Sequence, residues 1–83
     1  MFKIKLTAKA KKQLKKLSKE QRLSIAEIFE DIKDNPATGK PLERELARKF
    51  SYRTGVYRVI YIVHEEDQII TILDADHRGK IYN

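Results

Sequence analysis

Residues 50–63 read FSYRTGVYRVIYIV and predict a β-hairpin. Val56 to Val63 is an apolar run of strand-forming residues, and Phe50 to Arg53 forms a shorter strand before it. Thr54-Gly55 is a turn signal, because glycine readily adopts the backbone angles that tight hairpins need. A loop with an even number of residues pairs Arg53 with Val56 or with Arg58, so it fixes which side chains share a face.

The predicted hairpin has one polar and one apolar face. Residues that share the polar face are Lys49, Ser51, Arg53, Arg58, Ile60 and Ile62, whereas Tyr57, Val59, Tyr61 and Val63 take the face that suits a core. Arg58 interrupts an apolar run. A charge there needs a partner in the fold, with Asp74 or Asp76 as candidates, or serves a ligand that arrives later.

The segments around the hairpin predict one more strand on each side and two helices. Residues 2–6 alternate apolar residues with lysines, as a half-buried strand does. Thr7 suits the cap of a helix over 8–17, and Ser18 with Gln21 suits a capping box for a second helix that Pro36 ends. That helix would bury its apolar residues, which are Leu23, Ile25, Ile28, Phe29 and Ile32. Residues 69–73 read as the last strand, and a polar tail follows from Asp74.

The resulting order is β-α-α-β-β-β, an α+β fold with an antiparallel sheet and the N-terminal helical hairpin packed on one face. The length of 83 residues suits a single domain over residues 1–83, and 41% hydrophobic residues suffice for a core. The chain has no cysteine, which excludes disulfides and thiolate chemistry. We expect no signal peptide and no membrane span, hence a cytoplasmic protein.

The charge of the chain is concentrated near its N-terminus. The net charge is +6, and the first 19 residues hold eight lysines and no acidic residue. Such an asymmetry favours a surface for nucleic acid or another polyanion, although a lysine-rich solvated helix would give the same pattern.

A second group of reactive residues lies in the tail, where Asp76-His77-Arg78 is followed by Tyr82. These side chains can move a proton and hold a phosphate. A metal site from Asp74, Asp76 and His77 is disfavoured, because the spacing matches no standard ligand pattern. We therefore expect neither a metal nor a cofactor.

Three stretches resemble the RelE/ParE superfamily of bacterial and archaeal toxins. They are Gly39-Lys40-Pro41-Leu42, the segment from Phe50 to Tyr61, and His77-Arg78-Gly79-Lys80-Ile81-Tyr82. The resemblance covers essentially the whole chain. It implies the RelE-like microbial RNase fold and a toxin of a type II toxin–antitoxin pair.

RelE-like members cut messenger RNA in the ribosomal A site. The ribose 2′-OH attacks the adjacent phosphate and leaves a 2′,3′-cyclic phosphate. By resemblance, Arg58 would stabilise the transition state, Arg78 would hold phosphate, and His77 or Tyr82 would transfer protons. Ser51 stands where many members carry a basic residue, which leaves the general base open.

The resemblance also implies how RNA would be bound. Positive potential at the messenger RNA would come from Lys49, Arg53 and Lys80. The helix lysines would bind ribosomal RNA, and these are Lys9, Lys11, Lys12, Lys15 and Lys16. The implied partners are a RelB-like antitoxin, the ribosome and messenger RNA. Two alternatives stay open: a ParE-like inhibitor of DNA gyrase without nuclease activity, and an inactive homologue that only binds antitoxin or RNA.

Overall fold

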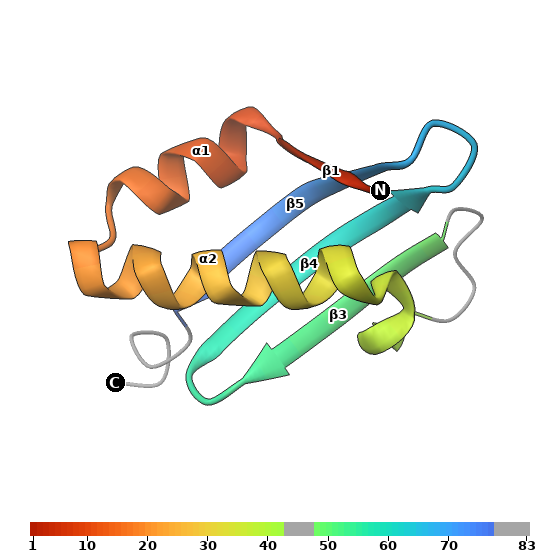
Figure 1. Cartoon of the computed structure of the whole chain (residues 1–83). Coiled ribbons are helices and arrows are strands. Elements are labelled where there is room, and N and C mark those ends of the chain that lie inside the picture. The colour runs from red at the N-terminus through yellow and green to blue at the C-terminus, as the bar shows by residue number, and fades with distance from the viewer. Residues whose placement is uncertain (43–47, 78–83) are drawn as a thin grey trace.

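The computed structural model describes residues 1–42 and 48–77, which form a five-stranded sheet with helices against one face (Figure 1). The strands are β1 (Lys3–Leu6), β2 (Lys40–Pro41), β3 (Arg48–Thr54), β4 (Tyr57–His64) and β5 (Ile69–His77). The helices are α1 (Ala8–Lys15), α2 (Lys19–Asp34) and the short 3-10 helix η1 (Pro36–Thr38). The predicted α+β class is confirmed. Neither α1 nor α2 is long and apolar enough to cross a membrane.

The sheet is mixed rather than wholly antiparallel, which corrects the sequence prediction. Its strand order is β1-β5-β4-β3-β2, and β1 pairs parallel to β5 with Lys3 opposite Ile69. The reason lies in the helix lengths. At about 1.5 Å per residue, the 16 residues of α2 span about 24 Å, which is close to the combined length of the 8-residue α1 and the 4-residue β1 before it. The chain therefore re-enters the sheet at the end where β1 began, and β3 and β5 run in the direction of β1 (Figure 1).

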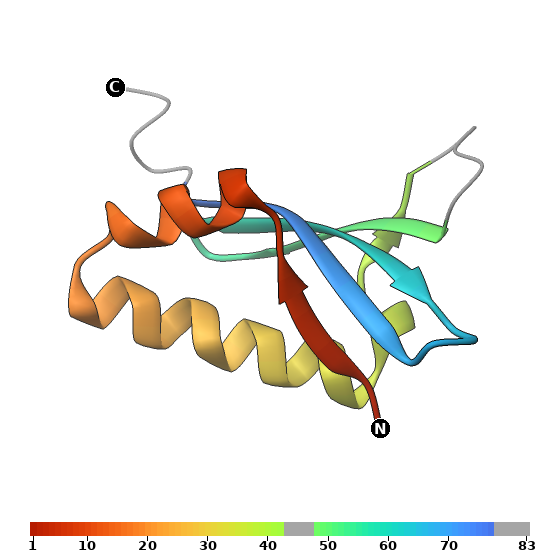
Figure 2. The same cartoon turned by 90° about the horizontal axis from the view of Figure 1, so that it is seen from above.

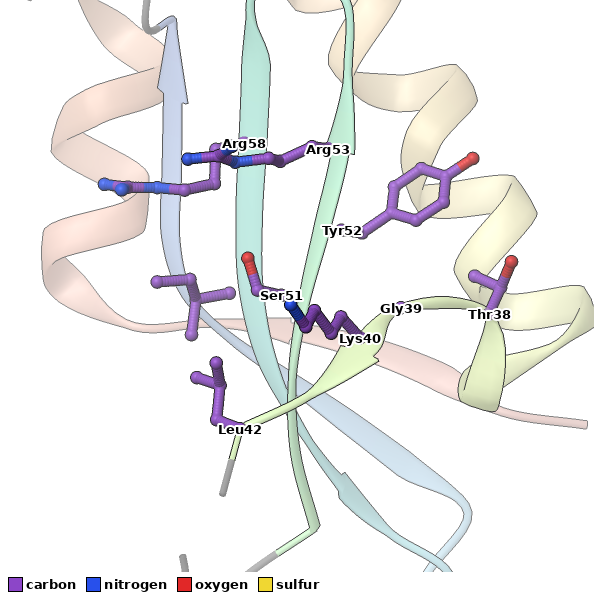
Figure 3. Close-up of a pocket in the computed structure, with 9 residues that line it drawn as sticks. Thr38, Gly39, Lys40, Leu42, Ser51, Tyr52, Arg53 and Arg58 are labelled. Carbon is purple, nitrogen blue, oxygen red and sulfur yellow. The ribbon is translucent and has the colours of Figure 1, made fainter. Parts of the chain in front are cut away.

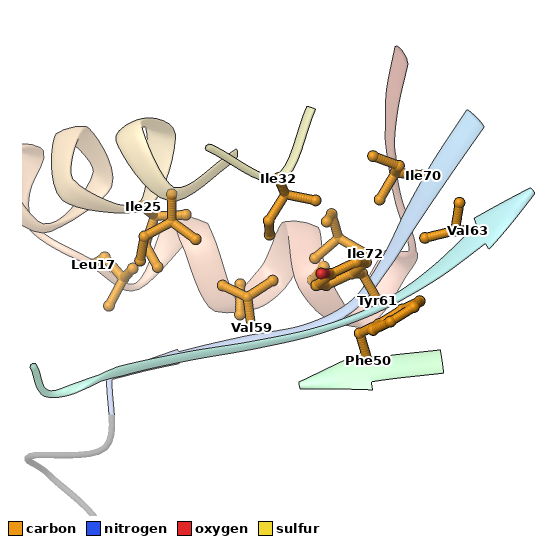
Figure 4. Close-up of a cluster of buried hydrophobic side chains, with 12 residues drawn as sticks. Leu17, Ile25, Ile32, Phe50, Val59, Tyr61, Val63, Ile70 and Ile72 are labelled. Carbon is orange, nitrogen blue, oxygen red and sulfur yellow. The ribbon is translucent and has the colours of Figure 1, made fainter. Parts of the chain in front are cut away.

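The hydrophobic core lies between the helices and the sheet (Figure 4). The buried side chains of the second helix are Ile25, Ile28 and Ile32, as predicted, but Leu23 is 58% exposed because it lies outside this stripe. Both helix caps form as predicted. Thr7 accepts a hydrogen bond from the backbone N–H of Ala10, and Ser18 with Gln21 forms a full capping box. Seen from above, α2 covers one face of the sheet and leaves the other face open (Figure 2).

The β3–β4 hairpin has the predicted even register. Arg53 lies opposite Arg58, and Thr54 lies opposite Tyr57 across the two residues of the turn. Gly55, the first of these two, has a φ of 59°, which glycine adopts without strain. Lys49, Ser51, Arg53 and Arg58 therefore occupy the sheet face that α2 does not cover.

Strand β5 is longer than predicted, which is a second correction. It continues from Leu73 to His77, and a bulge shifts its register so that Tyr61 pairs with Ile72 but Ile60 pairs with Asp74. β1 ends beside Ile72, so the edge of β5 beyond that point needs other partners. Gln13 of α1 supplies them, since its Oε1 accepts a hydrogen bond from the backbone N–H of Ala75 at 2.9 Å and its Nε2 donates to Asp74 Oδ1.

Candidate active site

A groove of about 670 Å³ lies on the open face of the sheet, between β4, β3 and the segment that contains β2 (Figure 3). Arg53 and Arg58 extend into it from neighbouring strands, and Lys40 extends from β2. The remaining lining residues are Thr38, Gly39, Leu42, Ser51, Tyr52 and Ile60. Three cations around one concavity suit a ligand with closely spaced negative charges, such as a nucleic-acid backbone.

One wall of the groove is held in place by Tyr61, a core residue. Its hydroxyl donates a hydrogen bond to the Pro36 carbonyl at 2.7 Å and accepts one from the Gly39 N–H at 3.0 Å. A Cβ at Gly39 would come within 2.7 Å of that hydroxyl and 3.1 Å of the Phe50 Cβ, so only glycine lets the wall approach this closely. The position of Lys40 therefore depends on a buried tyrosine of β4.

Arg58 forms ion pairs with two carboxylates of β5. Its Nη2 lies 3.1 Å from Asp74 Oδ2 and 3.9 Å from Asp76 Oδ2. Both of the partners considered from the sequence are therefore present. The Nε of Arg58 is buried and makes no hydrogen bond to the described residues. A guanidinium held by two acids, with a side chain that is still 26% exposed, is suited to phosphate recognition as well as to structure.

The two carboxylates have different surroundings. Asp74 is 8% exposed and also contacts Lys9 at 3.8 Å and Gln13, so it links α1 to Arg58. The side chain of Asp76 is 30% exposed. Its Oδ1 accepts a hydrogen bond from the His77 backbone N–H at 2.9 Å, and the contact described for Oδ2 is the 3.9 Å approach to Arg58.

His77 does not join Arg58. It pairs with Tyr57 and packs edge-on against that ring, with the ring centres 5.2 Å apart, whereas Arg58 pairs with Asp76. Neighbouring residues of a strand point to opposite faces, so His77 faces the helix side of the sheet. Arg58 and His77, for which the resemblance implies roles in the same reaction, therefore lie on opposite faces of the sheet, because the bulge before Asp74 shifts every later residue of β5 by one position.

The other predicted site residues fall into three groups. Lys49 and Arg53 lie on the face of Arg58, as their pairing with Ile62 and Arg58 requires. The lysines of α1 and its C-cap are all exposed, namely Lys9, Lys11, Lys12, Lys15 and Lys16. Arg78, Lys80 and Tyr82 lie outside the described residues.

Lys40, which lines the groove, and Asp76, which lies beside Arg58, were not predicted from the sequence as site residues. Lys40 belongs to the Gly39-Lys40-Pro41-Leu42 stretch, and its pairing with Ser51 across β2 and β3 brings it to the groove. The signal in the sequence for this arrangement is Gly39, because a glycine beside a strand can mark a close approach of two backbone segments.

A family model and a curated relative both relate the chain to toxins of toxin–antitoxin systems. A family model described as the ParE toxin of the type II toxin–antitoxin system parDE matches residues 4–82. The chain is 39% identical to Toxin RelG of Mycobacterium tuberculosis, over 98% of this chain and 95% of RelG.

Solved structures of toxin–antitoxin complexes are also similar. The RelBE2 complex of Mycobacterium tuberculosis contains a chain that matches with a TM-score of 0.82 and 38% identity, over 93% of this chain and 98% of that one. The archaeal RelE–RelB complex of Pyrococcus horikoshii gives a TM-score of 0.78 and 27% identity, over 95% of this chain and 97% of that one.

Proposed function

The chain belongs to the RelE/ParE superfamily of toxins from type II toxin–antitoxin systems, and from this premise we propose that it is a ribosome-dependent endoribonuclease that cuts messenger RNA. The 2′-OH of a ribose in the A site attacks the adjacent phosphate, and cleavage leaves a 2′,3′-cyclic phosphate and a 5′-hydroxyl. The protein acts in the cytoplasm, and a RelB-like antitoxin restrains it, as the RelBE complexes with similar chains suggest.

The observation that carries the proposal is the groove with Arg58, Arg53 and Lys40 on its walls. Negative charge builds up on the phosphate oxygens in the transition state, and cations already in position stabilise that charge without reorganisation. Arg58 is the most constrained of the three, since two carboxylates hold it, so we assign it to the reacting phosphate. Arg53 and Lys40 bind the flanking phosphates.

Residues outside the groove complete the proposal. Lys49 adds positive potential on the same sheet face, and the exposed lysines of α1 contact ribosomal RNA. Arg78, Lys80 and Tyr82 keep the roles that the resemblance implies for them. His77 faces away from Arg58, so in this proposal it supports Tyr57 rather than the reacting groups.

Primer extension on purified programmed ribosomes, with toxin freed of antitoxin, tests the activity. Wild type should cut in the A-site codon only when ribosomes are present. Arg58→Ala should lower the single-turnover rate by about 10²–10³-fold, the loss typical of removing one transition-state donor. Arg53→Ala and Lys40→Ala should mainly weaken binding.

Arg48→Ala is the matched control, because Arg48 is a cation of β3 that pairs with Glu65 at 2.8 Å and does not line the groove. It should cut at the wild-type rate. Thermal unfolding of each variant separates lost chemistry from lost folding. Folded wild type that makes no cut on any programmed codon would refute the nuclease proposal.

The ParE name of the matching family model favours a second candidate, the inhibition of DNA gyrase. A supercoiling assay with purified gyrase distinguishes the two. Inhibition of supercoiling without cleavage on ribosomes would support the second candidate against the first.

A further inference from the structure

We infer that Asp76 is the general base that removes the proton from the attacking 2′-OH. This inference rests on the proposed nuclease function. It names the proton acceptor for the site around Arg58.

The register of the sheet puts Asp76 in the row of the reacting cations. Arg53 lies opposite Arg58 across β3 and β4, and Arg58 lies opposite Asp76 across β4 and β5. Directly opposed residues of an antiparallel sheet share a face and lie about 4.5–5.5 Å apart at Cβ. The row therefore presents two guanidinium groups followed by one carboxylate on the open face.

The distance between Arg58 and Asp76 fits a shared reacting group. A phosphate oxygen bound by Arg58 would lie about 2.8 Å from a guanidinium nitrogen, and the attacking 2′-oxygen lies about 3–3.5 Å from phosphorus in a reactive geometry. Asp76 Oδ2 is 3.9 Å from Arg58 Nη2. A ribose hydroxyl next to that phosphate can therefore reach Oδ2 without a rearrangement of the backbone.

The other carboxylate beside Arg58 is already engaged. Asp74 is bonded by Arg58 and Gln13 and contacts Lys9, and its side chain is 11% exposed. Asp76 is held through Oδ1 by the N–H of His77, its Oδ2 lies 3.9 Å from Arg58 Nη2, and its side chain is 30% exposed. We assign Asp74 to holding Arg58 and α1, and Asp76 to proton transfer.

The chemistry of the neighbouring groups leads to the same assignment. Among the described residues, the charged groups lining the groove are Lys40, Arg53 and Arg58, and a protonated amine or guanidinium cannot accept a proton. A serine hydroxyl such as that of Ser51 is a poor base. An ionised carboxylate has free lone pairs that can accept the proton of a hydroxyl.

Asp76 Oδ2 takes the 2′-OH proton while the 2′-oxygen forms a bond to phosphorus and the bond from phosphorus to the 5′-oxygen breaks. The leaving 5′-oxygen takes a proton from water, and Asp76 later returns its proton to water. The products are a 2′,3′-cyclic phosphate and a 5′-hydroxyl.

Single-turnover cleavage on programmed ribosomes tests the inference with Asp76→Asn and Asp76→Glu. Asp76→Asn should slow cleavage by about 10²–10⁴-fold, the usual contribution of a general base, with KM changed by less than about threefold. Asp76→Glu should recover part of the rate, because a carboxylate is restored one methylene away. Asp67→Asn is the charge-matched control, since Asp67 is exposed in the β4–β5 turn, and it should cleave as wild type does.

A substrate with sulfur in place of the leaving 5′-oxygen separates a base from a residue that protonates the leaving group. Sulfur leaves without a proton, so a defect in a general acid disappears with this substrate and a defect in the base persists. We expect Asp76→Asn to stay slow. Recovery with the sulfur substrate, or cleavage of the ordinary substrate within threefold of wild type, would overturn the assignment to Asp76.

The same experiment separates this inference from the proposed function. If wild type cuts and Asp76→Asn cuts equally well, the nuclease stands and the base is another residue. If wild type does not cut, both are refuted. Thermal unfolding and ribosome binding of Asp76→Asn should match wild type, because Asn keeps an Oδ1 for the His77 N–H and Asp74 still holds Arg58 at 3.1 Å.

Discussion

Tyr61 is the residue that joins the core of the protein to the groove. It is fully buried, stacks on Phe50 with ring centres 5.4 Å apart, and fixes Pro36 and Gly39 through its hydroxyl. Burial raises the pKa of the Tyr61 phenol above its ordinary value of 10.0, and the hydrogen bond from Gly39 opposes this effect in part. The neutral phenol is therefore the form that the folded state favours.

This pKa predicts a loss of stability at high pH. Tyr61 ionises at a lower pH in the unfolded chain than in the folded chain. Its contribution to the free energy of unfolding is therefore complete below pH 10.0 and falls as the pH rises toward the folded-state pKa. Urea unfolding of wild type and Tyr61→Phe between pH 8 and 11 measures it. At pH 8 the variant should be less stable by about 1–3 kcal/mol, because the N–H of Gly39 loses its acceptor. The difference should shrink above pH 10, and parallel curves would contradict the prediction.

At the scale of single elements, α2 decides where the chain returns to the sheet. Its start is set by the capping box, in which Ser18 Oγ accepts from the Gln21 N–H at 3.1 Å and Gln21 Oε1 accepts from the Ser18 N–H at 2.9 Å. Its end is set by Pro36 just beyond Asp34. A helix with both ends fixed places η1 and β2 beside the groove.

Ser18→Ala should therefore lower the free energy of unfolding by about 1 kcal/mol, since the first turn of α2 loses its acceptor. Ser24→Ala makes the same chemical change inside α2 and should alter stability by less than about 0.5 kcal/mol. Urea unfolding at neutral pH compares the two. Equal losses at both positions would show that the capping box contributes nothing specific.

The strand β5 shows how one residue changes the chemistry of a surface. Without the bulge, the register that pairs Tyr61 with Ile72 would put Ala75 opposite Arg58 and His77 on the same face as Arg58. The extra residue instead puts Asp76 opposite Arg58 and turns His77 to Tyr57. The bulge thereby puts a carboxylate opposite Arg58, where Ala75 would otherwise lie, and removes the imidazole of His77 from that face.

At the scale of the whole molecule, two groups of cations stand out among the described residues. The exposed lysines of α1 form one, and the groove cations form the other. Asp74 connects them, since it contacts Lys9 of α1 and Arg58 of β4. This arrangement suits a partner that covers both, such as an RNA surface around a bound messenger.

Ribosome binding should depend on salt in proportion to the lysines that contact phosphate. Lys11→Gln with Lys15→Gln should reduce the slope of log K against log salt by roughly 1.4–1.8, as expected for two lost phosphate contacts. Lys3→Gln with Lys5→Gln removes the same charge from the edge strand β1 and should leave the slope unchanged. Sedimentation with ribosomes at several salt concentrations measures both. Equal changes in both variants would mean that net charge alone drives binding.

The parts of the fold and site that the sequence alone predicted depend on interactions between residues close together in the chain. Turn chemistry at Gly55 and the alternation along each strand predicted the face shared by Arg53 and Arg58, and the caps at Thr7 and Ser18 predicted both helix starts. These features depend on residues a few positions apart, so short stretches of sequence determine them. The family resemblance added the fold and the toxin class to this local information.

Only the tertiary structure decided which distant residues meet. Three features depend on contacts between distant parts of the chain. They are the parallel pairing of β1 with β5, the approach of Lys40 to the groove, and the position of Asp76 opposite Arg58. Gln13 illustrates the physical reason, because it stabilises the edge of β5 from a helix about 60 residues earlier in the chain. Strand register follows from such long-range partners, and a shift by one residue reverses every side chain that follows.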